Sequence, residues 1–153
     1  MRLAISGTEL EPTEPLDDLL RSAREVNTEF VELWYPRNTG TDGFENTVNT
    51  LHEADIRVAC VSTGSELYRK GGSLDDQALL IQAIRLAGSI KAPFANTYFG
   101  YHSVKDDDSA IEIYRRLLEP CLKVAEENEV TIVLENEFNA FASRCIAAAA
   151  AVD

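Results

Sequence analysis

Apolar runs rich in β-branched residues alternate with helical patterns along the whole chain. The runs begin about every 30 residues, and apolar residues recur at helical spacing between them. Neighbouring parallel strands need a crossover of roughly a dozen residues or more, usually a helix, and this spacing leaves room for one. The alternation therefore predicts an α/β fold with a parallel sheet. The expected strands cover residues 3–6, 30–34, 56–62, 94–99 and 130–136.

The predicted helices lie between these strands, at residues 15–26, 44–54, 75–90 and 108–128. Pro15, Asp17 and Asp18 suit the first turn of a helix, where the free N–H groups favour negative charge. Pro120 falls inside the fourth predicted helix. Because proline has no backbone N–H and its ring clashes with the preceding turn, we expect this helix to be kinked or split.

The charge and the cysteines narrow the class of protein. The net charge is -12, spread along the chain, and such a surface repels phosphate backbones, so no nucleic acid or membrane partner is expected. Cys60, Cys121 and Cys145 form no close pair, which favours a reducing compartment. Cys60 and Cys121 are interpreted as small core residues. With no signal-like segment, the predicted location is the cytoplasm.

The stretch at residues 130–136 ends an apolar run with Glu135 and Asn136. It reads as a buried strand, and the carboxyl end of a parallel strand is where α/β folds bind ligands. Glu135 is therefore a candidate site residue. The alternative is that Glu135 is an ordinary surface charge where a loop begins, and the pattern by itself leaves both interpretations open.

Three other residues are candidates for substrate binding. Glu32 and Trp34 share one face of the second predicted strand with Phe30, while Val31 and Leu33 share the other. A carboxylate such as Glu32 inside a barrel mouth needs a partner, so it either serves a site or makes a structural hydrogen bond to the loop of a neighbouring strand. Trp34 and Tyr35, expected at the same mouth, either stack on a sugar ring or cap the core. His102, in the loop after the fourth strand, either contacts substrate or is an exposed loop residue.

Several segments resemble one family. They are Gln82-Ala83-Ile84-Arg85-Leu86-Ala87 with Lys91-Ala92-Pro93, Phe30-Val31-Glu32-Leu33, and residues 118–130 running into Val133-Leu134-Glu135-Asn136. They are similar to the sugar phosphate isomerase/epimerase family, the xylose isomerase-like TIM barrels. The resemblance covers the whole chain and implies a (β/α)8 barrel. Glu129 departs from it, since the family often has glycine there.

The resemblance implies a role for Glu135. In the family, a glutamate at the end of the fifth strand is a metal ligand, and Glu135 stands at that position. The implied cofactor is a divalent metal, Mn²⁺, Mg²⁺, Zn²⁺ or Co²⁺. The other usual ligands come from the sixth to eighth strands, beyond residue 153. We therefore expect residues 1–153 to form one domain, the N-terminal and incomplete part of a barrel with its first five strand–helix units.

The implied activity is metal-dependent isomerisation or epimerisation of a sugar or sugar-like polyol, with Glu135 as catalytic and metal-binding residue. One alternative is a non-catalytic or truncated half-barrel that dimerises or binds a partner. The other is a metal-dependent endonuclease of the same superfamily. That enzyme needs several histidines and a basic face, whereas this chain has His52, His102 and a net charge of -12.

Overall fold

A computed structural model describes residues 3–7, 16–39, 44–68, 72–100, 107–136 and 149–150. Strands and helices alternate along these residues. The strands are β1 (Ile5–Ser6), β2 (Phe30–Tyr35), β3 (Arg57–Thr63), β4 (Phe94–Tyr98) and β5 (Thr131–Glu135). The helices are α1 (Leu16–Glu25), α2 (Glu45–Ala54), α3 (Leu74–Ser89) and α4 (Asp107–Glu127).

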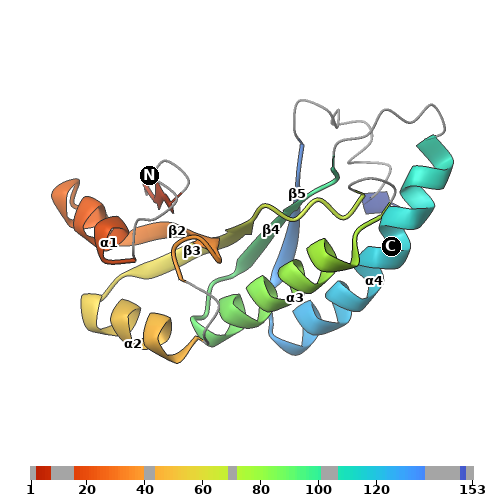
Figure 1. Ribbon diagram of the computed structural model, residues 1–153. Coiled ribbons are helices and arrows are strands. Elements are labelled where there is room, and N and C mark those ends of the chain that lie inside the picture. Colours follow the sequence, from red (N-terminus) through yellow and green to blue (C-terminus); the bar gives the residue numbers. More distant parts are fainter. Residues whose placement is uncertain are drawn as a thin grey trace.

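All strand pairs are parallel, and the order in the sheet is β1-β2-β3-β4-β5. Each strand thus lies beside the next one in the sequence, with a helix making the crossover from β1 through β5. In Figure 1, α3 and α4 lie side by side against the sheet. The Gln77 amide of α3 donates to the Leu117 carbonyl of α4 at 2.6 Å. The predicted α/β fold is confirmed.

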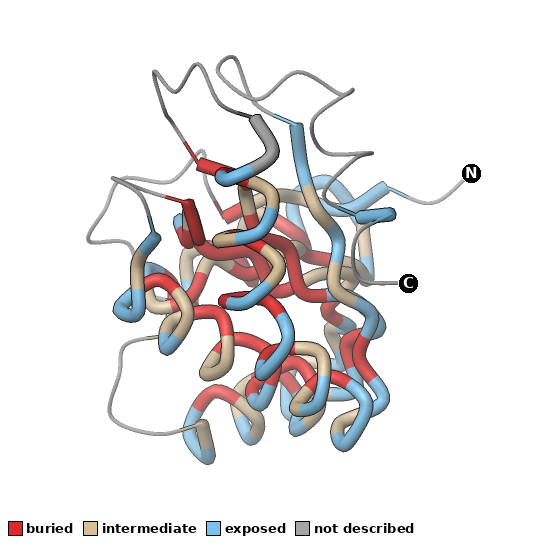
Figure 2. Tube along the Cα trace, turned by 90° about the vertical axis from the view of Figure 1, so that its right-hand side faces the viewer, coloured by how far each residue is buried: buried red, intermediate tan, exposed pale blue. Residues whose placement is uncertain are grey.

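The core lies between the sheet and the helices, and Figure 2 shows the buried residues gathered in the middle of the molecule. On β2 the buried residues alternate with half-buried ones, because successive side chains of a strand point to opposite faces. Val31 and Leu33 are fully buried and belong to the same apolar cluster as Leu80 and Ile84 of α3. This confirms the predicted division of the second strand into two faces.

Two details of the predicted elements are wrong. α1 ends at Glu25, so Val26 lies beyond it and is 58% exposed instead of joining the apolar stripe. α4 runs through Pro120 as one helix, so the expected split there is wrong, while a kink at Pro120 stays a prediction. The other boundaries differ from the predicted ones by one or two residues, as helix and strand ends usually do.

The strand interpreted as buried is the edge of this sheet. β5 pairs with β4 alone, and its residues alternate between exposed and half-buried. Val133 is 40% exposed on the face away from the helices. The prediction of a buried strand assumed that both faces were covered, whereas among the described residues only one face of β5 meets a helix.

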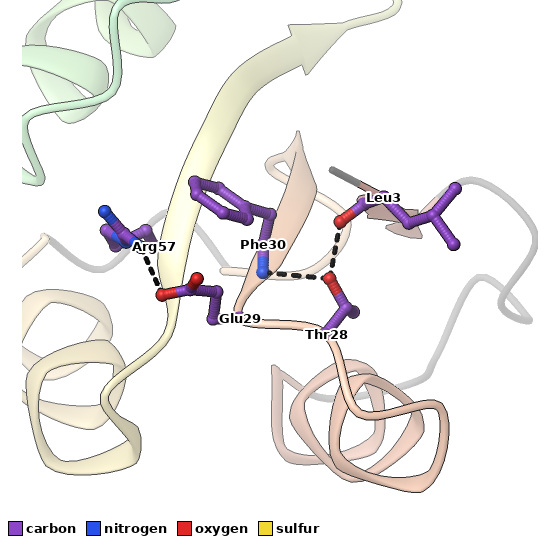
Figure 3. Close-up of polar contacts among 5 residues, drawn as sticks. All are labelled: Leu3, Thr28, Glu29, Phe30 and Arg57. Atoms are coloured by element: carbon purple, nitrogen blue, oxygen red, sulfur yellow. Dashed lines mark hydrogen bonds and ion pairs between the residues drawn. The ribbon is translucent and has the colours of Figure 1, made fainter. Parts of the chain in front are cut away.

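The starts of the first three strands are tied together by polar contacts (Figure 3). The Thr28 hydroxyl donates to the Leu3 carbonyl at 2.5 Å and accepts from the Phe30 N–H at 3.3 Å. Arg57, the first residue of β3, forms an ion pair with Glu29, and its guanidinium lies 4.5 Å from the centre of the Phe30 ring. These contacts hold the amino ends of β1, β2 and β3 in one register.

The other ends of β1 and β2 are joined through Asn38, which is 4% exposed. Its side-chain oxygen accepts from the Trp34 N–H at 2.8 Å, and its amide nitrogen lies 3.5 Å from the Gly7 carbonyl. A Cβ atom on Gly7 would fall 2.0 Å from that same side-chain oxygen. Glycine is therefore required here because the Asn38 side chain occupies the space.

We predict that Gly7→Ala destabilises the fold by about 1–3 kcal/mol, as overpacking of a close contact does. Asn38 cannot withdraw from the new methyl group without losing its bond to Trp34. Gly64→Ala is the matched control, since a Cβ there would meet nothing within 4 Å. Urea unfolding measures both variants. Equal midpoints for the two would contradict the packing that we describe.

Candidate active site on the inner face of the sheet

One face of the sheet packs on the helices, and we call the opposite one the inner face. Strand register places polar side chains from several strands on it: Glu32 pairs with Cys60, and Tyr98 pairs with Glu135. Because residues two apart share a face, Trp34, Ser62 and Asn96 lie there too. The inner face thus carries Glu32, Trp34, Cys60, Ser62, Asn96, Tyr98, Val133 and Glu135.

Glu135 is the last residue of β5 and its side chain is exposed. The Asn96 side-chain amide of β4 donates to Glu135 Oε2. Within the described ranges, no cationic side chain forms an ion pair with Glu135. The carboxylate is thus held by a neutral donor, which fixes its direction and leaves its charge uncompensated. The predicted strand-end position of Glu135 agrees with this arrangement.

Glu32 is half-buried on β2, two strands from Asn96. Its Oε1 accepts a hydrogen bond from the Ser62 hydroxyl of β3. The structural hydrogen bond proposed as the alternative for Glu32 therefore exists, although the partner lies in the neighbouring strand and not in its loop. The bond leaves Oε2 of Glu32 available on the inner face, so a role in substrate binding stays a prediction.

Cys60 lies between the two carboxylates. The pKa of its thiol is raised to about 11, mainly by burial and also by the negative charges of Glu32 and Glu135, while the hydrogen bond with Ser62 lowers it. The sulfur is 3.8 Å from the Ser62 hydroxyl. Both carboxylates therefore act on one small region. Cys60 is half-buried on the inner face, so its interpretation as a core residue is wrong, whereas Cys121 is fully buried as predicted.

The aromatic residues after Glu32 separate onto different faces. Trp34 is half-buried on the inner face, and the Arg37 guanidinium lies 5.7 Å from the centre of its ring. Its buried indole N–H has no hydrogen-bond partner in the described structure. Tyr35 is buried on the helix side, where it meets Phe44 edge to face. Tyr35 therefore does not join Trp34 at the inner face, and one side of the Trp34 ring is occupied by Arg37.

His102, the remaining candidate for substrate binding, lies outside the described residues, as does the loop that holds it. His52 is exposed on α2, as predicted for a surface residue. A cavity of about 550 Å³ does include His52, Arg57 and Lys91. It lies at the amino end of β3, the opposite end of the strands from Glu135, so it is no part of the candidate site.

The residues that could hold a metal on the inner face are few. No group of three His, Cys, Asp or Glu side chains suited to a metal ion occurs in the described ranges. Glu135 still has the chemistry of a ligand for a hard divalent ion, because it is an exposed carboxylate that no described cation neutralises. It fits a metal site as one oxygen ligand of several.

Sequence reasoning missed Ser62 and Asn96, the two residues that bind the carboxylates. The only signal for them is local. Ser62 and Asn96 are polar residues within predicted strands, and a buried amide or hydroxyl needs a partner. The sequence does not name that partner, since Asn96 and Glu135 are brought together by the β4–β5 pairing.

No protein-family model matches the sequence, and no curated protein matches it either. Solved structures do match its fold. L-ribulose 3-epimerase superposes with a TM-score of 0.72 at 15% identity, covering 96% of this chain and 55% of the epimerase. A xylose isomerase-like TIM barrel protein from Mycobacterium smegmatis in complex with magnesium gives 0.70 at 16% identity, covering 99% of this chain and 61% of that one.

A third match is the family 2 AP endonuclease from Brucella melitensis, with a TM-score of 0.77 at 12% identity over 99% of this chain and 64% of the endonuclease. The chain therefore spans less than two thirds of each of these proteins. At such identities the likeness shows the fold: five strands and four helices of a xylose isomerase-like (β/α)8 barrel. The partial barrel predicted from the sequence is confirmed.

We predict that the two described thiols react slowly with iodoacetamide at neutral pH, because only the thiolate is nucleophilic. Burial raises the pKa of Cys121 to about 12, and that of Cys60 to about 11. Alkylation of Cys60, followed by peptide mass spectrometry across pH 7–11, should rise toward the upper end of that range. In urea the alkylation rate of Cys60 should depend on pH as that of an ordinary thiol does, with its midpoint at about pH 8.5. A native midpoint near the unfolded one would refute this environment for Cys60.

Proposed function

We propose that the protein is a metal-dependent isomerase or epimerase that acts on a sugar or a sugar-like polyol. The observation that carries the proposal is the place of Glu135. It ends β5, faces the inner side of a partial xylose isomerase-like barrel, and carries a carboxylate that no cation among the described residues neutralises. Barrels of this type carry their chemistry at the carboxyl ends of the strands.

Moving a proton next to a carbonyl requires a group that takes the proton and returns it. A carboxylate fixed beside the reacting carbon can do both. Glu135 is assigned this position, with its orientation held by Asn96. Glu32 and Trp34 are assigned to bind the substrate: Glu32 has one oxygen beyond its bond to Ser62, and Trp34 has an unpartnered indole N–H.

The proposed cofactor is a divalent ion such as Mn²⁺, Mg²⁺, Zn²⁺ or Co²⁺, which would polarise the substrate carbonyl and stabilise the negative charge that forms. Glu135 would supply one of its ligands. The xylose isomerase-like protein from Mycobacterium smegmatis, whose structure is a complex with magnesium, supports a divalent ion on this fold. The proposed substrate is a small sugar, His102 stays a predicted contact to it, and the proposed location is cytoplasmic.

Two other functions are compatible with the same fold. The likeness to a family 2 AP endonuclease makes DNA cleavage a candidate, but a net charge of -12 opposes binding to a phosphate backbone. A binding module formed by a second copy of the chain is the other, since the open inner face and the edge strand β5 leave surfaces that a partner could cover. A binding module does not explain why a carboxylate is oriented at the end of β5, whereas a metal-dependent endonuclease would also use it, so the net charge is what separates that alternative from the isomerase.

No helix in the described part of the chain is long and apolar enough to cross a membrane. The chain could still act as a homo-oligomer, and analytical ultracentrifugation of the full-length protein addresses that question separately from its activity.

We predict that the full-length protein with Mn²⁺ exchanges substrate C–H hydrogen for deuterium when ketoses are incubated in D2O. The exchange follows from removal and return of the proton next to the carbonyl, so it occurs whichever epimer forms. Glu135→Gln keeps the size of the side chain and removes its basicity, so exchange should fall by roughly 10²–10⁴-fold. Nuclear magnetic resonance of a panel of ketoses measures it. Cleavage of DNA containing abasic sites, without any exchange, would favour the endonuclease instead.

We predict separately that Glu135→Gln weakens Mn²⁺ binding of the full-length protein, measured by calorimetry. A neutral amide is a poorer ligand for a hard cation than a carboxylate. Glu126→Gln removes an equal charge from the exposed side of α4 and should leave the affinity unchanged. If Glu135→Gln binds Mn²⁺ as the unchanged protein does, the assignment of Glu135 as a ligand is wrong.

A further inference from the structure

We propose that Asn96 is a positioning residue that fixes the direction of the Glu135 carboxylate for the proposed metal. The inference rests on the proposed function, because it assigns a task to Asn96 only if Glu135 is a ligand. It concerns a residue that the sequence did not single out. Three observations carry it: a hydrogen bond, the burial of the amide, and an oxygen atom without a partner.

The bond between the two side chains spans neighbouring strands. Asn96 pairs in register with Val133 of β5, two residues before Glu135, so both side chains lie on the inner face. The Asn96 Nδ2 atom donates to Glu135 Oε2. A carboxylate only accepts hydrogen bonds, so the amide must turn its NH₂ group toward Glu135 and its oxygen the other way.

That orientation leaves the Asn96 oxygen without a hydrogen-bond partner in the described structure, although the residue is only 5% exposed. A buried acceptor without a partner destabilises a fold, because it has lost its hydrogen bonds to water. An apolar side chain of similar size would avoid this loss. Stability therefore does not explain the amide, whereas orienting Glu135 does.

The neutral donor also suits the proposed ligand better than a charged one. Lysine or arginine at this position would bind Glu135 more strongly but would cancel the charge that attracts a cation. The Asn96 amide occupies one oxygen of Glu135 and leaves the other without a partner among the described residues. Groups that orient a metal ligand in this way typically change metal affinity by 10–100-fold when they are removed.

The test compares Mn²⁺ affinity with folding stability in Asn96→Leu of the full-length protein. Leucine keeps the size of the side chain, removes the buried acceptor, and breaks the bond to the exposed Glu135, which water can then solvate. We expect calorimetry to show Mn²⁺ binding weakened by roughly 10–100-fold. In metal-free buffer, the urea midpoint should stay the same or rise.

Val133→Thr is the matched control. Val133 is an inner-face neighbour of Asn96, the substitution changes its shape very little, and the Asn96–Glu135 bond stays intact. Its Mn²⁺ affinity should equal that of the unchanged protein. If Asn96→Leu does not fold, Asn96→Ala removes the same bond and should weaken Mn²⁺ binding equally, with some loss of stability from the missing side chain.

Two results would overturn the proposal. One is unchanged Mn²⁺ affinity in the folded Asn96 variant. The other is a lower urea midpoint for Asn96→Leu with weakened binding, because Asn96 would then act by supporting the fold. Failure of the proposed function looks different: Glu135→Gln itself would then bind Mn²⁺ normally, whatever the Asn96 variants do.

Discussion

Burial of alternate strand residues beneath the helices is the interaction on which the rest of this structure depends. Val31, Leu33 and Val61 lose all contact with water when α3 and its neighbours cover one face of the sheet. Successive side chains of a strand point to opposite faces. Once these apolar residues face the helices, Glu32 and Ser62 must lie on the inner face. A slip of one residue would place the carboxylates against the helices, so packing of the core also places the candidate site.

The inner face is the opposite case, since its polar groups are organised by pairs across strands. Ser62 binds Glu32, Asn96 binds Glu135, and Cys60 between them feels both charges. Burial and the two carboxylate charges raise the pKa of that thiol to about 11, so it lies between the anions as a small neutral group at neutral pH and above. The arrangement directs two carboxylates into one region while neutral donors leave their charge in place, which is what a site for a cation or a polarised carbonyl requires.

The site residues that could be predicted are those marked by a local sequence pattern, and the residues that were missed depend on how the strands pair. Glu135 was found because it ends an apolar run and matches a family motif, and Glu32 because its neighbours alternate. Asn96 was missed because nothing in Phe94–Tyr98 indicates which residue of another strand it meets. The exposure of β5 was missed for a related reason, since a run of branched apolar residues reads the same in a covered strand and in an edge strand.

The sequence by itself determined the order of strands and helices, the faces of β2, and the candidacy of Glu135. The first two depend on periodicity within one segment, which local backbone geometry imposes, and the third depends on the end of an apolar run and on a family motif. Only the tertiary structure decided that Asn38 requires a glycine at position 7 and that Asn96 binds Glu135. These contacts join residues roughly 30 to 40 positions apart, and they exist because parallel strands with helical crossovers bring distant segments side by side.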